Sequence, residues 1–332
     1  MMSDFMKVDV VIPWVDSEDP LWNEKRNSWS HVAKTKEGNS SQRFRDFGTL
    51  KYLLRSIEEN ADWVNKVYIL TDDQVPDWIN EKEVQIIDHK DFIPAEYLPT
   101  FNSNVIELNA WRIPNLSERF ILLNDDLVFV GKTRRSDFFN DKGFPMDVMA
   151  QSILMPRDDF SHIAVNNIAI INKSFDKRTW LKKYWSRAFS FKNGVSLNSM
   201  SLGVSLLKYF TRFYDPHVAT PYLKSSFEWL YDTHPTTMAA CLKNKFRGYD
   251  DISHWAVRYY QIVSGISYPK SYKYGRYLEI TDCAQLKAHF RNRSTKIVAL
   301  NDKVSSREEW NLAMQTIDLL DAKYYKQSKY EW

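Results

Sequence analysis

Cysteine and long apolar runs are both scarce in this chain of 332 residues. Its two cysteines, Cys241 and Cys283, are too few for a disulfide framework, although they could pair with each other. No run approaches the ~18 apolar residues that a membrane-spanning helix requires, and the N-terminus lacks the basic and apolar regions of a secretory signal. We therefore expect a reduced, soluble, cytoplasmic protein, with peripheral contact to the inner face of the cell membrane left open.

Several familiar catalytic and binding motifs are also absent. The sequence contains no GxxxxGK[ST] phosphate loop, no GxGxxG opening a helix and no GxSxG nucleophile turn. Its cysteines and histidines do not have the spacing of a zinc site. The formal net charge is +3, with acidic and basic residues mixed along the chain, so no clustered basic face points to nucleic acid. What the chain does have is 44% apolar and 15% aromatic residues, enough for a sizeable core.

Short apolar runs alternate with helical patterns along the chain. Runs rich in β-branched residues predict buried strands, and apolar residues recurring on one face predict helices such as Thr49–Asn60. This alternation is typical of an α/β, Rossmann-like fold in which a mainly parallel sheet is flanked by helices. We expect one domain over residues 1–332, with a less regular helical insertion at 140–215 and an irregular loop at 18–42 that orders over a ligand. The predicted strands are Val8–Pro13, Val67–Thr71, Val84–Ile87, Arg119–Leu123 and Lys296–Leu300, and further predicted helices are Phe227–Lys243, Trp255–Val263 and Arg307–Tyr324.

Acidic residues follow three of the predicted strands. Asp16 comes after VVIPWV, Asp125 and Asp126 after FILLN, and Asp302 after KIVALN. In open α/β sheets ligands bind beyond the carboxyl ends of the strands, where carboxylates can hold a hard cation that bridges to substrate phosphates. Each aspartate alone could instead reflect the preference of this residue for turns. The adjacent pair, Asp125 and Asp126, favours a metal site more strongly, because neighbouring anions repel unless a positive charge lies between them.

Basic and aromatic residues supply further candidates. Arg43 stands just before a predicted helix and Arg247 lies in FRGYDD, and the planar guanidinium of arginine offers paired donors to phosphate. The alternatives are a solvated helix start for Arg43 and an ion pair with the neighbouring aspartates for Arg247. His217 lies in a proline-flanked loop, where it is either inert or able to accept a proton from an attacking hydroxyl. Trp14 is either a core residue or an aromatic face for a sugar or a base.

Four blocks of sequence, in order along the chain, carry more than a local pattern. The longest begins with RFRDFGTLKYLLRSIEENADWVNKVYILTDDQVPDWI (43–79) and continues through HKDF (89–92), LPTFNSNVIE (98–107) and RFILLNDDLVF (119–129). The others are IPWVD (Ile12–Asp16), the segment 217–251 with 30 residues from His217 to Arg247, and KIVALND (296–302). In these blocks the chain resembles the Stealth family. Members of that family include bacterial capsule hexose-1-phosphate transferases and the catalytic subunit of the lysosomal N-acetylglucosamine-1-phosphotransferase.

The resemblance implies a phosphotransferase whose donor is a nucleotide-sugar such as a UDP-hexose or a UDP-N-acetylhexosamine. An acceptor hydroxyl would attack the β-phosphorus, UMP would leave, and the hexose-1-phosphate or N-acetylhexosamine-1-phosphate would enter a phosphodiester in capsular or cell-surface polysaccharide. Such chemistry depends on positioning and charge neutralisation more than on covalent help from the protein. The implied acceptor is a glycan, expected as a lipid-linked oligosaccharide at the inner face of the membrane.

The resemblance also implies roles for individual residues. Asp125 and Asp126 are the candidate ligands of Mg²⁺ or Mn²⁺, and His217 is the candidate general base for the acceptor hydroxyl. The remaining assignments are Arg43 and Arg247 to the phosphoryl oxygens, Asp251 to the orientation of Arg247 or the metal, and Asp16, Trp14, Asn124 and Asn102 to the donor-binding side of the site.

Two other functions are compatible with the same residues. One is a conventional metal-dependent glycosyltransferase, which would release UDP, and the other is a glycan-binding or scaffold protein without catalytic activity. The stretch WLKKYWSR (180–187) could touch anionic lipid headgroups, or it could be a partly buried helix with solvated lysines. The surrounding segment, 140–215, is expected to shape the choice of acceptor.

Overall fold

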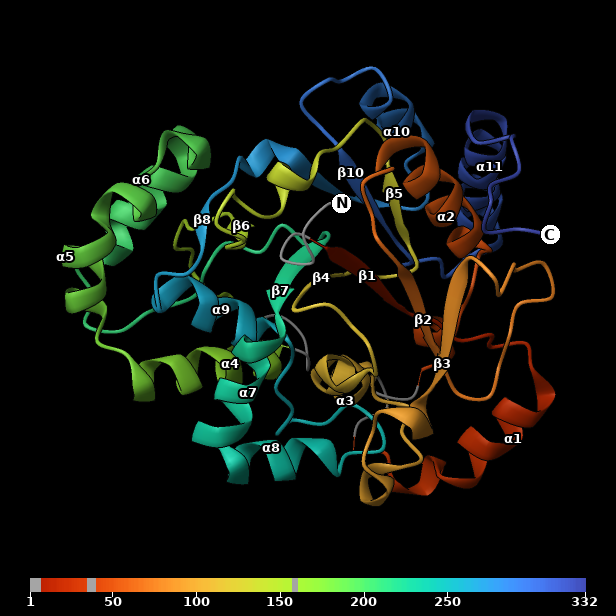
Figure 1. The fold of residues 1–332 in the computed structure, drawn as a ribbon, viewed down its shortest axis with the longest axis horizontal. Helices are drawn as coiled ribbons and strands as arrows, with labels where there is room; N and C mark the ends of the chain where they lie inside the picture. Colours follow the sequence, from red (N-terminus) through yellow and green to blue (C-terminus); the bar gives the residue numbers. More distant parts are fainter. Residues whose placement is uncertain (1–6, 35–39, 157–160) are drawn as a thin grey trace.

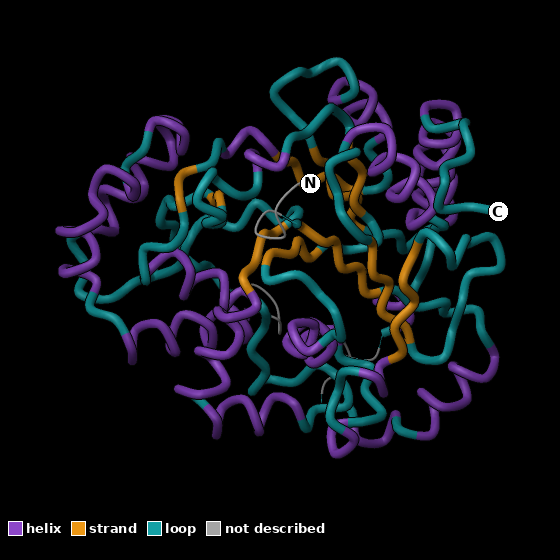
Figure 2. The backbone as a smooth tube through the Cα atoms, viewed as in Figure 1, coloured by secondary structure: helices purple, strands orange, loops and turns teal. Residues whose placement is uncertain are grey.

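A five-stranded sheet lies at the centre of the computed structural model, which describes residues 7–34, 40–156 and 161–332 (Figure 1). The strand order is β3-β2-β1-β4-β7. The first four strands are parallel and β7 is antiparallel to β4, so the prediction of a mainly parallel sheet is confirmed. Figure 2 shows the strands crossing the middle of the molecule with helices around them. The strands are β1 (Val8–Pro13), β2 (Val67–Thr71), β3 (Val84–Asp88), β4 (Arg119–Leu122) and β7 (Thr220–Leu223).

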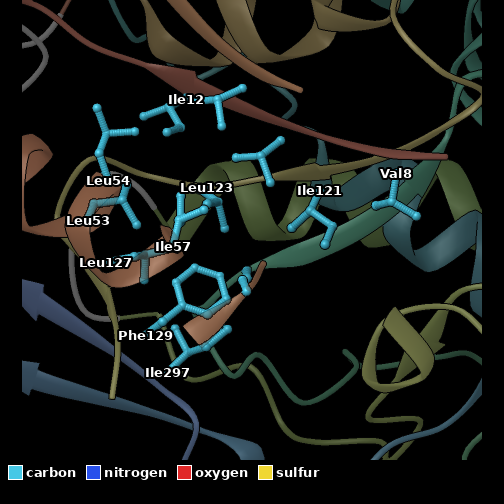
Figure 3. Packing of buried hydrophobic residues seen from close by; sticks show 14 of the residues in the cluster. Val8, Ile12, Leu53, Leu54, Ile57, Ile121, Leu123, Leu127, Phe129 and Ile297 are labelled. Atoms are coloured by element: carbon cyan, nitrogen blue, oxygen red, sulfur yellow. The ribbon is translucent and has the colours of Figure 1, made fainter. Parts of the chain in front are cut away.

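Both faces of this sheet are buried, which is why its strands are nearly continuous apolar runs. Side chains alternate along a strand, so Val10 and Ile12 of β1 pack on the side covered by α2 (Thr49–Asn60). Val11 packs on the other side, which α3 (Ser103–Asn109) covers. Figure 3 shows the first of these clusters, where residues of α2 face residues of β1 and β4.

A second, three-stranded sheet adjoins the first and has the order β5-β10-β9. β10 is antiparallel to β5 and parallel to β9. Because β5 follows β4 after a short turn, the two sheets are joined at the residues that follow β4. The strands are β5 (Leu127–Phe129), β9 (Gly275–Glu279) and β10 (Ile297–Asn301), and the helices that pack on them are α10 (Cys283–His289) and α11 (Arg307–Lys323).

Helices from the middle of the chain form one end of the molecule (Figure 1). The helices Ser161–Ser174, Lys177–Ala188 and Trp255–Val263 contribute to an aromatic cluster that includes Trp180, Phe213 and Tyr259. Throughout the three described stretches of chain, no helix is both long and apolar enough to cross a membrane. The helices are α4 (Ser161–Ser174), α5 (Lys177–Ala188), α6 (Gly194–Ser205), α7 (Lys224–Thr233), α8 (Pro235–Leu242) and α9 (Trp255–Val263), with the short strands β6 (Met146–Asp147) and β8 (Tyr268–Pro269) beside them.

The predicted loop at 18–42 is wrong over its first part, because α1 (Pro20–Ser28) occupies it. The carboxylate of Asp19 accepts hydrogen bonds from the first main-chain N–H groups of this helix, and proline stands at its first position. Both are standard features of a helix start. Residues 35–39, within the same predicted loop, lie outside the described residues.

The predicted helix Phe227–Lys243 is also wrong, because two helices replace it. α7 ends at Thr233 and α8 begins at Pro235. Proline has no N–H to donate and disfavours a helical conformation in the residue before it, so the helix breaks at His234.

The other predicted strands and helices are confirmed to within a residue at their ends. The possible cysteine pair does not form. Cys241 is buried and Cys283 is half-buried, and both thiols are free. The expectation that residues 140–215 shape the choice of acceptor stays a prediction.

Candidate functional site

The pairing of β4 with β7 decides which residues meet at the carboxyl edge of the central sheet. β4 runs parallel to β1, so both strands end at the same edge, and Asp125 and Asp126 follow directly after β4. β7 runs in the opposite direction, and its first residue, Thr220, pairs with Leu122 at the end of β4. His217 precedes Thr220 by three residues. It therefore lies at the edge where the two aspartates lie.

The second sheet brings another strand end to the same place. The main-chain N–H of Leu300, near the end of β10, donates to the carbonyl of Asp126 at 3.0 Å. On β9, the ring of Tyr277 meets the ring of His217 edge to face, with centroids 5.0 Å apart. The ends of β1, β4 and β10 and the start of β7 thus converge. We call the turn 124–126 and the residues around it the acidic edge.

The carboxylates of Asp125 and Asp126 are half-buried side by side in the turn after β4. Burial raises the pKa of Asp125 well above its usual value, and the charges of Asp46 and Asp126 raise it further. Burial likewise raises the pKa of Asp126 to about 6, although a charge on His217 acts in the opposite direction. Within the described structure, the Oδ1 atom of Asp126 is buried and has no hydrogen-bond partner. A cation at this position would relieve the repulsion.

These two carboxylates fit a divalent cation that keeps part of its coordination shell for a substrate. Over residues 7–34, 40–156 and 161–332, no three His, Cys, Asp or Glu side chains are grouped closely enough to hold a metal ion by themselves. Mg²⁺ does not need such a cage, because it is usually held by one or two carboxylates together with waters and substrate phosphates. Asp46 adds negative charge nearby, but its Oδ2 atom accepts a hydrogen bond of 2.9 Å from Nε1 of Trp14. Asp125 and Asp126 are therefore the candidate ligands.

Three of the residues predicted to bind the donor lie on the chain around this edge. Asn124 is exposed in the turn itself, and Trp14 is half-buried just beyond β1. Asp16 lies two residues further on, where Gln74 holds its main chain through two hydrogen bonds of 2.9 Å. Its carboxylate accepts from the main-chain N–H of Glu18 at 2.8 Å. Asp16 thus shapes the segment that follows β1.

His217 is held in an exposed position by its backbone and by two aromatic rings. Its φ angle of 49° is in the left-handed region, which is uncommon for residues other than glycine. The main-chain N–H donates to Oδ1 of Asp215 at 2.9 Å, and the side chain is 48% exposed. The imidazole lies almost parallel to the ring of Trp255, with centroids 6.2 Å apart. The ring of Tyr277 is nearly perpendicular to the imidazole. The ring orientation is therefore fixed although the ring faces solvent.

Arg247 is positioned by a buried polar network that contains two other predicted residues. Asp251 is fully buried, and its carboxylate accepts hydrogen bonds from Asn102 at 2.8 Å and Asn244 at 2.6 Å. Asn102 is also fully buried and caps the start of α3. The first residue of that helix, Ser103, accepts a hydrogen bond from the guanidinium of Arg247. In this structure Asn102 and Asp251 contact each other. Through the start of α3 they hold in place the serine to which Arg247 donates.

Sequence reasoning missed a buried pair, Glu107 and His254, on which the charges of Arg247 and His217 act. Burial raises the pKa of Glu107 to about 7, against the opposing charge of Arg247. Burial lowers the pKa of His254 to about 3, and the charges of His217 and Arg247 also act on it. Nε2 of His254 lies 3.6 Å from Oε2 of Glu107, and its Nδ1 atom lies 2.6 Å from the hydroxyl of Tyr222. This contact is thus between a neutral imidazole and a carboxyl group that titrates near neutral pH, not between two ions.

The sequence did contain one signal for this pair. Glu107 ends the block LPTFNSNVIE and stands next to Leu108 in a helix whose side chains are mostly buried. Lys, Glu, Arg and Asp are almost never fully buried without a partner. A glutamate at a position of this kind therefore indicates a special environment.

Arg43 and Asp302 flank the acidic edge. Arg43 is exposed in the short helical turn Ser41–Phe44. It precedes by three residues Asp46, whose charge raises the pKa of Asp125. Asp302 follows β10 and forms an ion pair of 3.4 Å with Arg45. Asp302 therefore already has an arginine partner from the protein, whereas Asp125 faces the negative charges of Asp46 and Asp126.

Comparison with known proteins gives consistent matches. The family model for Stealth protein CR2, conserved region 2, matches residues 43–147, which include the acidic turn and Glu107. An exopolysaccharide phosphotransferase, cps2G, of Lactiplantibacillus plantarum is 37% identical over 98% of this chain and 96% of its own. A capsular polysaccharide phosphotransferase, WcwK, of Streptococcus pneumoniae is 33% identical over 99% of both chains. A solved galactosyltransferase, LgtC, aligns over 95% of both chains with 10% identity and a TM-score of 0.39, too low to support an argument. The near-full-length relatives and the matched conserved region together show that this chain belongs to the Stealth family.

Proposed function

We propose that this protein transfers a hexose-1-phosphate or an N-acetylhexosamine-1-phosphate from a UDP-sugar to a sugar hydroxyl of a growing capsular or cell-surface polysaccharide. Relatives that align over nearly the whole chain are named polysaccharide phosphotransferases. The observation that carries the proposal is the meeting of the acidic turn with His217 at one edge of the sheet. The acceptor is a glycan, carried on a lipid at the inner face of the membrane, where the protein works as a peripheral enzyme.

In this reaction the acceptor oxygen forms a bond to the β-phosphorus of the donor. The bond from that phosphorus to the oxygen bridging the two phosphates breaks, and UMP leaves with this oxygen. The product contains a phosphodiester between two sugars. The proton of the acceptor hydroxyl must leave during the step, and negative charge on the phosphoryl oxygens must be neutralised.

His217 takes the proton of the acceptor hydroxyl. Its Nδ1 atom is turned toward Asp215, at 4.0 Å from Oδ1, which leaves Nε2 for the hydroxyl. The rings of Trp255 and Tyr277 hold the plane of the imidazole. General-base catalysis by a positioned side chain contributes about 10²–10⁴-fold in rate.

Arg247 neutralises charge on the transferred phosphoryl group. Burial lowers the pKa of Arg247, and the negative partners Glu107 and Asp251 oppose this change, so the guanidinium stays charged at neutral pH. A cation that is fixed in advance in a poorly solvated environment stabilises a developing anion more than the same cation in water. Arg43, exposed on the flanking segment, would complete the contacts to the phosphates.

Asp125 and Asp126 would hold Mg²⁺ or Mn²⁺, and the raised pKa of both carboxyl groups supports this assignment. Such an ion, when bound, neutralises and orients the diphosphate. Trp14 and the exposed Asn124 flank the same carboxylates and would contact the nucleotide or the sugar.

The identity of the released nucleotide tests the proposal. The purified protein is incubated with a panel of nucleotide-sugars, Mg²⁺ and a polysaccharide extract as acceptor, and the products are identified by mass. Release of UMP together with an acid-labile sugar-phosphate-sugar linkage is the expected result. Release of UDP would instead identify a conventional glycosyltransferase, and no turnover with any donor would identify a glycan-assembly scaffold.

A further inference from the structure

Helix α6 exposes the kind of side chain that a helix of a soluble protein normally buries. Its two buried residues are Ser201 and Val204. On its exposed side, Val195 is 85% and Leu202 is 55% exposed. A helix at the surface of a globular protein usually turns its apolar stripe toward the core. α6 thus presents apolar residues to the outside.

The exposed apolar residues of α6 continue onto the end of α5 and the turn between the two helices. They line a hollow of about 410 Å³, to which Trp185 and Phe189 of the α5 side contribute rings with centroids 4.0 Å apart. Phe191, in the turn, is 100% exposed, and Leu206, just after α6, is 87% exposed. Large exposed apolar patches mark sites of interaction with proteins or membranes. We call this patch the α5–α6 face, made up of Trp185, Phe189, Phe191, Val195, Leu202 and Leu206.

The charge of this part of the chain has one sign. Residues 177–214 contain eight lysines and arginines and no aspartate or glutamate, although the whole chain has 42 acidic residues. Five of these cations, on α5 and in the turns before and after α6, are exposed: Arg178, Lys182, Lys183, Lys192 and Lys208.

We propose that the α5–α6 face docks on an anionic membrane surface. Tryptophan and other apolar side chains, such as Trp185 and Phe191, insert at the level of the lipid headgroups, and neighbouring lysines attract anionic lipids. A second copy of this chain is a poorer occupant, because a twofold interface would set the same cations against each other. The charge of the face complements an anionic bilayer and does not complement itself.

The position of the face connects it to the acidic edge. In Figure 1, α5 and α6 form one end of the longest axis of the molecule, opposite α1 and α11. From the end of α6 the chain runs through residues 206–216 directly to His217. Docking through this face would keep the protein at the bilayer, where a lipid-carried acceptor presents its sugar. This inference rests on the proposed function, because it explains how the protein reaches a lipid-carried acceptor. Its test measures membrane binding and does not depend on catalysis.

Vesicle binding by the full-length protein tests the proposal. We expect the protein to sediment with vesicles of phosphatidylcholine mixed with phosphatidylglycerol, and not with phosphatidylcholine alone, and we expect added salt to weaken binding. Each lysine near an anionic surface multiplies the partition coefficient roughly fivefold, so Lys182→Glu/Lys183→Glu should lower it at least ~25-fold. Phe191→Ser should lower it about tenfold or more. The Asp126→Asn variant should bind as the wild type does, even if the proposed function fails.

Matched controls carry the same changes at the opposite end of the molecule. Lys326→Glu/Lys329→Glu replaces two exposed lysines near the C-terminus, and Leu21→Ser replaces an apolar side chain of α1 that is 76% exposed. Both should bind vesicles normally. Absence of vesicle binding, or binding that persists in either variant of the α5–α6 face, would overturn the proposal. A dimer in solution that Phe191→Ser dissociates would replace the membrane with a second copy.

A fluorescent probe distinguishes docking through this face from binding elsewhere. Phe191→Cys in a Cys283→Ser background offers one accessible thiol, because Cys241 is buried. An environment-sensitive dye on this thiol should shift to shorter emission wavelengths when anionic vesicles are added. Unchanged emission while the protein sediments with the vesicles would show that another surface binds them, and would sink the assignment.

Discussion

Two sets of buried or half-buried charged residues in this molecule are built in opposite ways. Arg258 and Asp147 have side chains only 1% and 7% exposed and form a bidentate ion pair with distances of 2.6 and 2.8 Å. Burial by itself would lower the pKa of Arg258, but the adjacent charge and hydrogen bonds of Asp147 raise it. At the acidic edge, Asp125 and Asp126 face Asp46 and each other.

The difference separates charges that hold the fold from charges that we propose to act on a ligand. The Arg258–Asp147 pair compensates its charge within the protein and holds together the elements that contribute it, although Nη1 of Arg258 has no hydrogen-bond partner among the described residues. Carboxylates with a raised pKa and an unpartnered oxygen keep their capacity for a ligand, and the free energy they cost the fold is recovered when a cation arrives. Arg258 thus joins α9 to β6, whereas Asp125 and Asp126 are the residues that we propose hold a cation.

Replacing Asp126 with asparagine should produce the largest effect on activity. Asp126→Asn keeps the shape of the side chain and removes its charge, so turnover should fall by at least roughly 10²–10³-fold. The fold should tolerate the change, because burial disfavours the charge that is removed and that charge also repels Asp125. Mg²⁺ should raise the thermal unfolding midpoint of the wild type and not that of the variant. Thermal denaturation with and without Mg²⁺, beside activity measurements, checks both parts, and Asp141→Asn on the exposed surface is the control.

Replacing His217 should slow the chemical step with little effect on the fold. His217→Ala should lower kcat by about 10²–10⁴-fold while donor affinity stays close to normal. The side chain is 48% exposed, so its loss should leave the unfolding midpoint nearly unchanged. Single-turnover kinetics together with donor titration separates the two effects, and His289→Ala in α10 is the matched histidine control. A collapse of donor affinity with a normal chemical step would reject the base assignment.

Breaking the ion pair of Arg258 with Asp147 should lower the stability of the fold. Arg258→Met leaves Asp147 buried without its partner, which should lower the free energy of unfolding by about 3–5 kcal/mol. The double variant Arg258→Met/Asp147→Leu should recover much of this loss, because no buried charge remains. Urea unfolding of the three proteins measures both changes. If the single variant proved as stable as the wild type, the claim that the Arg258–Asp147 pair stabilises the fold would be wrong.

The sequence predicted the elements whose character is local. β1, β2 and α2 are fixed by apolar runs or one-sided helical patterns, and the structure has them at the predicted residues. α1 was missed because Trp22 is its one buried residue, so it carries no apolar stripe. β5 and β7 are short strands that exist through pairing with β10 and β4, and such pairing leaves no local pattern.

The same division holds for the candidate site. The acidic pair after β4 could be proposed from sequence, because two adjacent aspartates after a strand are a local signal. That His217 lies beside them depends on the antiparallel pairing of β7 with β4, which only the fold reveals. The burial of Asn102 and Asp251, and the pairing of Glu107 with His254, likewise arise from contacts between segments far apart in the chain.

A second ion pair, between Arg55 and Glu331, should give the smallest change in stability when it is broken, and this change should depend on pH. Arg55 of α2 binds Glu331 through two hydrogen bonds of 2.8 Å. Burial alone would raise the pKa of Glu331, but the hydrogen bonds of Arg55 and Ser328 outweigh it and lower the pKa from its usual 4.5 to about 2. Glu331→Gln should therefore cost about 1.5–3 kcal/mol of stability at neutral pH.

The pH profile of that loss shows whether charge is its cause. Because the pKa of Glu331 is lower in the folded protein than in the unfolded chain, the folded state binds fewer protons between about pH 4.5 and 2. The stability from this pair is fully present above pH 4.5 and is lost as the pH falls toward 2. Urea unfolding midpoints of the wild type and Glu331→Gln should therefore converge as the pH is lowered below 4.5. A constant offset at every pH would mean that Glu331 acts through packing, and the compensated pairs would then stabilise the fold by shape and not by charge.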